Sequence, residues 1–298
     1  MENGAQENVI AVLTTVYPEV MGYLEMFLAT LEAQTENHFD LVIVNDGLDG
    51  LGKICERHGR LTYRVVNSCS TPASNREKGL RYCVNAGYEY VVFADSDDYF
   101  EPERVELLIA KIRGLSMDCV VNDVNLVNDK SGEIIQSYFS NRLSNDQLIK
   151  FEDIKHSNIF GLSNTAVRAN CLSGIEIDPE LIAVDWYLFT LLLLRGCSAV
   201  FTNETNTFYR QHGANTVGFG QVTIESMKRS ILIKSKHYRV LAGTFNELTG
   251  LSDYYAGLAA RTSDEKYIRQ YYSKCLGRLP EYPFWWEEAV SNECINEN

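Results

Sequence analysis

Positive charge is scarce in this sequence. Its 298 residues include 27 Lys and Arg against 40 Asp and Glu, which gives a formal net charge of -13. Nucleic-acid-binding proteins normally carry a basic patch, so this balance argues against nucleic acid as a partner. The hydrophobic content of 45% is that of a folded globular protein. A chain this acidic needs a local cation or a bound metal ion wherever it holds an anionic ligand.

Long apolar runs are also missing. No run approaches the roughly 20 residues of a membrane-spanning helix, and the longest candidate, Trp186–Leu194, is interrupted by Thr190. The opening residues, MENGAQEN, lack the basic and apolar regions of a secretory signal peptide. We therefore expect a cytoplasmic protein, either free or peripheral at the inner face of the membrane.

The eight cysteines form no C-x-x-C pair, which argues against a zinc site. Four of them, Cys83, Cys119, Cys171 and Cys197, stand among apolar residues, where a free thiol behaves as a small hydrophobic group. The sequence therefore favours reduced thiols over disulfides.

Two glycine-rich nucleotide-binding motifs are absent. No G-x-G-x-x-G follows the first apolar run, Val9–Leu13, and no G-x-x-x-x-G-K-[ST] occurs. These absences argue against a dinucleotide-binding turn and against a phosphate loop.

An apolar run that leads directly into acidic residues is present. Tyr90–Ala94 suits a strand buried on both faces, and Asp95, Ser96, Asp97 and Asp98 follow it. Ligands of open α/β sheets bind at the carboxyl ends of strands, and crowded carboxylates repel one another unless a cation holds them. Because Mg²⁺ prefers oxygen ligands, the segment predicts a site for a metal-bound diphosphate. The alternative is that Asp97 or Asp98 caps the next helix.

Strand-like and helix-like segments alternate along the first half of the chain, which predicts an α/β fold with a parallel sheet and right-handed crossovers. Gly132–Phe139 is expected at a sheet edge, and Ile159–Val167 is expected to return to the sheet. The predicted strands are Val9–Leu13, Phe39–Val44, Leu61–Val66, Tyr90–Ala94, Met117–Val121 and Cys197–Phe201. Three helices are predicted over residues 71–87, 102–112 and 183–195. Two more are predicted to begin near Pro18 and near Val222.

Polar side chains end three of these strands. Thr14 and Thr15 follow the first, Asn45 and Asp46 the second, and the acidic cluster follows Tyr90–Ala94. Because the carboxyl ends of parallel strands share one edge of a sheet, these residues should converge on a nucleotide pocket.

Asp185 stands in the first turn of a predicted helix that is apolar nearly all round. Two interpretations are open. A carboxylate at this position is stabilised by the helix dipole, or it is a general base whose pKa is set by burial.

The C-terminal part carries two further features. Five basic side chains and no acidic ones lie between Lys228 and Arg239, which indicates either a solvated helix face or a surface for an anionic lipid or phosphate-bearing acceptor. The second feature is the adjacent pair Trp285 and Trp286. Three interpretations remain open for it: contact with a membrane interface, contact with another subunit in a homo-oligomer, and ordinary packing.

The order of these pieces resembles the inverting nucleotide-sugar glycosyltransferases of family 2, which have the A-type fold. The resemblance covers roughly Val9–Thr216, and its motifs are individually weak but occur together in the family's order and spacing. They are Thr14-Thr15, N-D-G at 45–47, S-N-R-E-K-G-L at 74–80, D-S-D-D at 95–98, V-D-W at 184–186 and Y-R-Q-H at 209–212.

The resemblance implies an A-type fold with a mostly parallel central sheet flanked by helices. It implies a catalytic domain over residues 1–217, with a nucleotide-binding part at about 8–100 and an acceptor part at about 101–217, and a helical extension over 218–298. It implies that Asp185 is the catalytic base and that Asp97 and His212 hold Mn²⁺ or Mg²⁺. The implied nucleotide-binding residues are Thr14, Thr15, Tyr17, Asp46, Arg76, Asp95 and Ser96.

The sequence departs from the family's pattern in three places. Val16-Tyr17 stands where Tyr-Asn is usual, Glu77 replaces an Asn after Arg76, and Val184 replaces a Glu before Asp185. The first change puts the base-stacking residue in doubt, and the third removes a charge that helps to place acceptors.

The resemblance implies a metal-dependent enzyme of the hexosyl- or N-acetylhexosaminyltransferase type, acting in bacterial surface polysaccharide synthesis. It would move a sugar from a nucleoside diphosphate sugar, of the UDP type, to a hydroxyl of a glycan or lipid-linked acceptor. One alternative is a sugar nucleotidyltransferase, but Val16–Gly22 supplies no glycine-rich basic loop. The other is an inactive sugar-nucleotide or glycan-binding module, against which the intact Asp95, Asp97, Asp185 and His212 speak.

Overall fold

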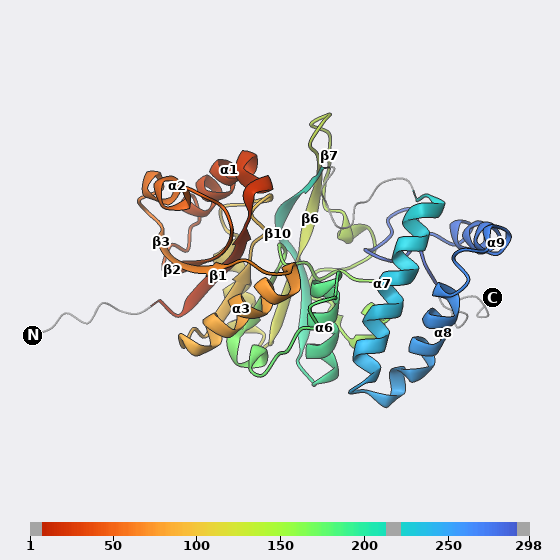
Figure 1. Ribbon diagram of the computed structural model, residues 1–298. Coiled ribbons are helices and arrows are strands. Elements are labelled where there is room, and N and C mark those ends of the chain that lie inside the picture. The colour runs from red at the N-terminus through yellow and green to blue at the C-terminus, as the bar shows by residue number, and fades with distance from the viewer. Residues whose placement is uncertain (1–7, 213–221, 291–298) are drawn as a thin grey trace, which may run out of the picture.

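A computed structural model of the chain describes residues 8–212 and 222–290 (Figure 1). The described residues form one ten-stranded mixed sheet, in the order β3-β2-β1-β4-β9-β6-β10-β5, with β7 paired to β6 and β8 paired to β10. The strands are β1 (Ile10–Val16), β2 (Phe39–Asp46), β3 (Thr62–Ser68), β4 (Tyr90–Phe93), β5 (Tyr99–Phe100), β6 (Cys119–Asn128), β7 (Ile134–Ile135), β8 (Leu148–Ile149), β9 (Thr165–Arg168) and β10 (Ala199–Gln211).

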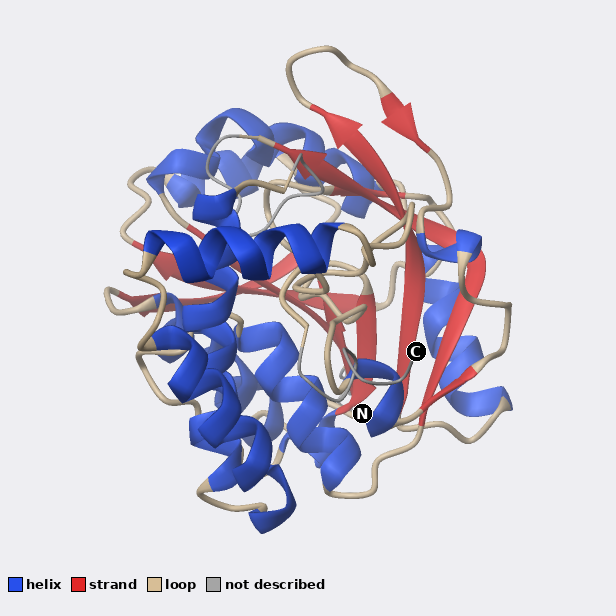
Figure 2. Ribbon diagram, turned by 90° about the vertical axis from the view of Figure 1, so that its right-hand side faces the viewer, coloured by secondary structure: helices blue, strands red, loops and turns tan. Residues whose placement is uncertain are grey.

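Helices lie on both sides of the strand layer (Figure 2). The α-helices are α1 (Met21–Glu32), α2 (Leu51–Arg57), α3 (Pro72–Asn85), α4 (Arg104–Gly114), α5 (Phe151–Ile154), α6 (Val184–Leu194), α7 (Ile224–Ala242), α8 (Thr249–Ala259) and α9 (Glu265–Leu276). Short 3-10 helices cover Pro18–Val20, Phe139–Asn141, Ala169–Leu172 and Asn246–Leu248.

Successive residues of the central strands point to opposite faces of the sheet and so enter two cores. Val12 and Ile43 pack with the apolar residues of α1, α2 and α4. Leu13 and Val44 pack with those of α3, α6 and the C-terminal helices. Both faces are covered, which explains why these strands are continuous apolar runs.

The N-terminal half of the sheet confirms the predicted crossover arrangement. β3, β2, β1 and β4 pair in parallel. Helix α2 was not predicted, because it spans only seven residues and buries only Leu51, Ile54 and Cys55. So short a helix gives a periodic pattern too brief to recognise.

The second half of the sheet is mixed. Ile159–Val167 returns to the sheet as predicted, and its strand, β9, runs antiparallel between β4 and β6. β10 is much longer than the predicted Cys197–Phe201 and continues through Gln211, so it includes Tyr209, Arg210 and Gln211 of the Y-R-Q-H motif. β7, in the predicted edge segment, pairs antiparallel with β6.

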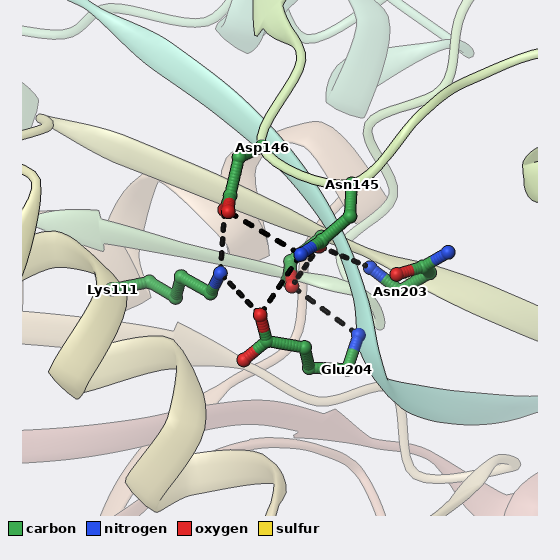
Figure 3. A network of polar contacts seen from close by, with 6 residues as sticks. Lys111, Asn145, Asp146, Asn203 and Glu204 are labelled. Carbon is green, nitrogen blue, oxygen red and sulfur yellow. Dashed lines mark hydrogen bonds and ion pairs between the residues drawn. The ribbon is translucent and has the colours of Figure 1, made fainter.

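A bulge divides β10. Its register against β6 shifts between Thr202 and Asn206, and a polar network holds the shifted segment (Figure 3). Lys111 of α4 forms ion pairs with Asp146 and with Glu204, the latter at 2.6 Å. The amide of Asn145 donates to Glu204 at 2.9 Å. The bulge therefore sets where the second half of β10 runs, beside the acidic cluster.

The C-terminal helices α7, α8 and α9 pack into the same core as α6, which places them together on the right of Figure 1. The predicted boundary at residues 217–218 lies outside the described residues. Among the described helices, none combines the length and apolarity needed to cross a membrane.

Candidate active site

A cavity of about 170 Å³ opens at the edge of the sheet where β1 and β4 end and α6 begins. Seven of the predicted site residues line it. They are Thr15, Tyr17, Arg76, Asp95, Ser96, Asp97 and Asp185. Two of the three predicted strand ends, those of β1 and β4, therefore converge at this cavity, whereas Asn45 and Asp46 at the end of β2 do not line it.

Arg76 of α3 connects two of the strand ends. Its guanidinium donates to the Thr15 hydroxyl at 2.9 Å and to Asp95 at 2.5 Å. Burial raises the pKa of Asp95 to about 6, against the lowering effect of Arg76, and the nearby Asp97 raises it further. Ser96 donates to the backbone carbonyl of Thr15 at 2.7 Å and fixes the acidic loop to β1.

The acidic cluster does not cap the following helix. Helix α4 begins at Arg104 with Glu103 at its N-cap, so the alternative interpretation of Asp97 and Asp98 is wrong. Asp98 is 1% exposed and accepts from the backbone N–H of Arg210 at 2.8 Å. Asp97 faces the cavity instead. Neighbouring carboxylates thus have different surroundings.

Asp97 and His212, the two residues predicted to hold a metal ion, lie together. Nε2 of His212 is 2.9 Å from Oδ2 of Asp97, and the His212 ring stacks on Tyr23. His212 lines an adjoining pocket that shares Tyr17 with the main cavity. Carboxylate oxygens suit Mg²⁺ and Mn²⁺, and a substrate diphosphate supplies further oxygens. This donor set fits the implied divalent ion.

Two arginines donate hydrogen bonds to the backbone at the end of β4 and in the acidic loop that follows it. The side chain of Arg210 donates to the backbone carbonyl of Asp97 at 2.8 Å. Arg104 is fully buried and donates to the Phe93 carbonyl at 2.9 Å and to Asn122 at 3.0 Å. Burial lowers the pKa of Arg104 to about 9, and Asp98 opposes this shift. Both arginines hold the backbone that presents Asp97.

Asp185 lies in the first turn of α6, as predicted, on the cavity wall. Burial raises the pKa of its carboxyl to about 7, the backbone N–H of Trp186 opposes this, and Asp95 adds to it. The side-chain amide of Asn158 donates to Asp185 at 3.2 Å. A carboxyl with a pKa near neutrality, at a cavity wall, has the properties of a general base.

Two of the predicted nucleotide-binding residues do not line the cavity. Thr14 is fully buried within β1, because alternation along the strand turns it away from the face of Thr15. Asp46 ends β2 and accepts from the backbone N–H of Ser70 at 3.4 Å. In the N-D-G motif, Asn45 shapes the turn by accepting from Leu48 at 2.9 Å.

Several lining residues were not predicted as site residues. They include Ser163, Asn164, Tyr209, Trp285 and Trp286. The P-F-W-W run was a usable signal, but its position in the fold was not readable from the sequence. Glu77, a departure from the family pattern, accepts from the backbone N–H of Ile177 and so anchors the loop before α6.

The basic stretch Lys228–Arg239 is largely compensated by acidic partners. Lys228 pairs with Glu225 and Glu265, and Lys236 pairs with Asp178 and Glu180. A further cation, Lys234, is fully buried and donates to the His156 carbonyl at 2.6 Å. This pairing weakens the case for a lipid-binding face.

Two of the cysteines lie close together near the amino-terminal ends of β6 and β10. The sulfur atoms of Cys171 and Cys197 and a carboxylate oxygen of Asp118 all lie within 4.8 Å of one another. Both thiols are half-buried and pack against the apolar core that contains the fully buried Cys83 and Cys119, so all four cysteines have the apolar surroundings that the sequence predicted. Burial raises the pKa of both half-buried thiols, which favours their protonated form.

Comparison of the sequence with known proteins gives consistent matches. The sequence model described as "Glycosyl transferase family 2" matches residues 11–171. The chain is 26% identical to glycosyltransferase GlyA of Streptococcus pneumoniae over 214 residues, which are 67% of this chain but 30% of that protein. It is 25% identical to an Escherichia coli protein, the UDP-Glc:alpha-D-GlcNAc-diphosphoundecaprenol beta-1,3-glucosyltransferase WfaP, over 75% of this chain and 88% of that one.

Solved structures share the fold. S. aureus TarS 1-349 in complex with UDP-GlcNAc matches 77% of this chain and 66% of its own, with a TM-score of 0.57 and 19% identity. The mannosyltransferase PcManGT from Pyrobaculum calidifontis, in complex with GDP-Man and Mn2+, matches 83% of this chain and 69% of its own, with a TM-score of 0.57 and 14% identity.

Proposed function

The chain belongs to glycosyl transferase family 2, and on that basis we propose that it moves a sugar from a nucleoside diphosphate sugar, of the UDP type, to a hydroxyl of a glycan or lipid-linked acceptor. One observation carries this proposal: the Asp97–His212 pair lies at the sheet edge, beside the cavity that Asp97 and Asp185 both line. The site would therefore combine a metal ion, held by Asp97 and His212, that stabilises the charged leaving group with a carboxylate, Asp185, that accepts the proton of the acceptor.

The donor would lie along the ends of β1 and β4. Thr15, Arg76 and Asp95 form a connected polar surface there, and Tyr17 adds an aromatic ring. The side chains of Asp97 and His212 would hold a divalent ion, which when bound neutralises charge on the diphosphate. Arg210 and Arg104 keep the Asp97 loop in position, so little reorganisation is needed when the donor binds.

Asp185 would act as the general base. Its carboxylate takes the proton of the acceptor hydroxyl, and the oxygen attacks the anomeric carbon of the donor sugar. The bond between that carbon and the diphosphate oxygen breaks, the nucleoside diphosphate leaves with the electron pair, and the configuration inverts. Asn158 donates to Asp185 and orients its carboxyl.

The proposal is tested by measuring nucleoside diphosphate release from a panel of UDP, GDP, CDP and dTDP sugars with Mn²⁺. We expect one donor class to be hydrolysed slowly and the Asp185→Asn protein to lose sugar transfer while it still binds the nucleotide. Asp253→Asn, an exposed carboxylate on α8, is the matched control and should behave as wild type. Unchanged transfer by the Asp185→Asn protein would remove Asp185 as the base.

A further inference from the structure

The C-terminal segment Tyr282–Val290, here called the strap, returns from α9 to the cavity. It places Trp285 and Trp286 on the cavity wall with Asp185. Both tryptophans are 3% exposed. A segment beyond the family-matched residues 11–171 therefore completes the pocket.

The strap is fixed to the catalytic part of the chain. Arg142 forms an ion pair with Glu287, stacks over Phe284 at 3.8 Å, and donates to the Tyr282 carbonyl at 3.1 Å. The Tyr138 hydroxyl donates to the backbone of the same segment at 3.0 Å. These contacts fix the position of the strap against the segment that carries Tyr138 and Arg142.

The C-terminal helices hold the other end of the strap. The hydroxyl of Tyr255 donates to the Ala289 carbonyl at 3.1 Å, and that of Tyr271 donates to the Val290 carbonyl at 2.6 Å. Buried hydrogen bonds of this kind give a segment a unique conformation. The backbone that carries the two tryptophans is therefore held at both ends.

Trp286 has two unfavourable local features. Its φ is 66°, in the left-handed region that bulky residues rarely adopt. Its indole N–H is buried and has no hydrogen-bond partner among the described residues. Each feature is unfavourable and persists only where the surroundings impose it, which is typical of functional sites.

Trp285 connects the strap to the proposed catalytic base. Its backbone exchanges hydrogen bonds with that of Asn158, at 2.8 and 3.1 Å, and the Asn158 side chain donates to Asp185. Its ring lies over Gly161, where an added Cβ would come within 3.3 Å of it. The strap is therefore on the Asp185 side of the cavity, where the acceptor hydroxyl has to lie.

We propose that Trp285 and Trp286 form the wall of an acceptor subsite that takes a pyranose ring, so that the acceptor is a sugar and not an open-chain polyol. A pyranose has an apolar face of C–H groups, which suits an indole ring, and a rim of hydroxyls, which suits an indole N–H donor and a carboxylate. This inference rests on the proposed function, because it names the acceptor of the same reaction.

The first test observes the indole N–H signals of the three tryptophans by ¹H–¹⁵N NMR, assigned with single Trp→Phe variants. The probes are methyl and p-nitrophenyl glycopyranosides of glucose, galactose and N-acetylglucosamine, with glycerol and ribitol as open-chain controls. We expect a pyranoside to shift the Trp286 and Trp285 signals and to leave Trp186, which donates to the Ile154 carbonyl, unchanged. Equal shifts with the polyols, or no shift with any pyranoside, would overturn the proposal.

The second test is kinetic and uses the pyranoside that gives the largest shift. Trp286→Ala should lower kcat/KM for that pyranoside at least about tenfold, while donor hydrolysis and the Kd for UDP change less than about twofold. Tyr282→Phe is the matched control, because Tyr282 belongs to the strap, does not line the cavity and accepts from Arg142 through its backbone carbonyl. An equal loss in the control, or a loss of UDP affinity in Trp286→Ala, would contradict an acceptor wall.

The two proposals fail in different ways. If the wild-type protein neither binds nor hydrolyses any nucleotide sugar, the proposed function is wrong, whatever the indole signals do. If donor hydrolysis occurs but pyranosides leave the indole signals unchanged, only the acceptor subsite is wrong.

Discussion

At the scale of single residues, neighbouring acidic side chains of this site have different surroundings. Asp97 faces the cavity beside His212, Asp98 is buried against the backbone of Arg210, and Asp95 is paired with Arg76. The three residues differ in their partners and burial, although they stand within four positions of the chain. Their roles are therefore set by the fold around them.

Transfer should depend on pH through Asp185. Burial raises the pKa of its carboxyl to about 7, and a general base acts only when it is ionised. We expect kcat/KM for the acceptor to rise about tenfold per pH unit below pH 7 and to level off above it. Initial rates between pH 5.5 and 9 check this, and a flat profile below pH 7 would show that Asp185 is not the base.

The same raised pKa predicts a stability effect. Because the folded protein holds the Asp185 proton more tightly than the unfolded chain, this carboxyl stabilises the fold at acidic pH and loses that contribution as the pH rises through 7. Asp185→Asn should therefore raise the free energy of unfolding at pH 8 by about 1–3 kcal/mol and by much less at pH 5. Urea unfolding at the two pH values measures the difference.

If the free energy of unfolding of the Asp185→Asn protein at pH 8 does not exceed that of wild type, then burial of this carboxylate does not cost the stability that we assign to it. The exposed Asp253 provides the control, since Asp253→Asn should leave stability within about 0.5 kcal/mol at both pH values.

The cavity position of residues that belong to short sequence motifs could be predicted, and that of residues brought in by tertiary pairing could not. Arg76, Asp97 and Asp185 each stand in a motif at a strand end or helix start, where chain order already indicates the sheet edge. Asn158 and Trp285 are joined by an isolated bridge between segments far apart in the sequence. No local pattern encodes such a pairing.

At the scale of elements, the bulge in β10 decides where the end of that strand lies. Residues before the bulge pair with the start of β6, and residues after it carry Arg210 to the acidic loop. The predicted strand stopped at Phe201 because the bulge residues Asn203 and Glu204 are polar and exposed. A hydrophobic pattern cannot follow a strand through such a break.

Lys111→Met should weaken the support of this bulge. The substitution keeps the aliphatic stem but removes ion pairs to Asp146 and Glu204. We expect a loss of about 1 kcal/mol in the free energy of unfolding, since both carboxylates are partly solvated, and a lower rate of donor hydrolysis. Urea unfolding and nucleotide release measure the two effects. Lys53→Met, at an exposed position on α2, is the control, and an equal change there would contradict a specific role for Lys111.

At the scale of the whole molecule, the C-terminal helices and the catalytic part share one apolar core. Residues of α3 and α6 belong to the same buried cluster as residues of α7, α8 and α9. A helical C-terminal extension could be predicted from its pattern, but its packing on α6 could not, because periodicity identifies an apolar face without naming its partner.

The shared core predicts cooperative unfolding. We expect a single calorimetric transition that coincides with the loss of tryptophan fluorescence, because the strap is joined to both parts of the chain: Trp285 packs against Phe139 and Tyr209, and Tyr255 of α8 donates to the Ala289 carbonyl. Two separated transitions would show that the C-terminal helices unfold independently. Differential scanning calorimetry and fluorescence on the same sample make the comparison.

The most direct test of the central claim, that Asp97 and His212 hold a divalent ion against the donor diphosphate, is isothermal titration of UDP with and without Mn²⁺. We expect Mn²⁺ to tighten UDP binding at least about tenfold in the wild-type protein and to have no such effect in Asp97→Asn, whose thermal unfolding should remain close to wild type. Equal Mn²⁺ dependence in the two proteins would contradict the claim.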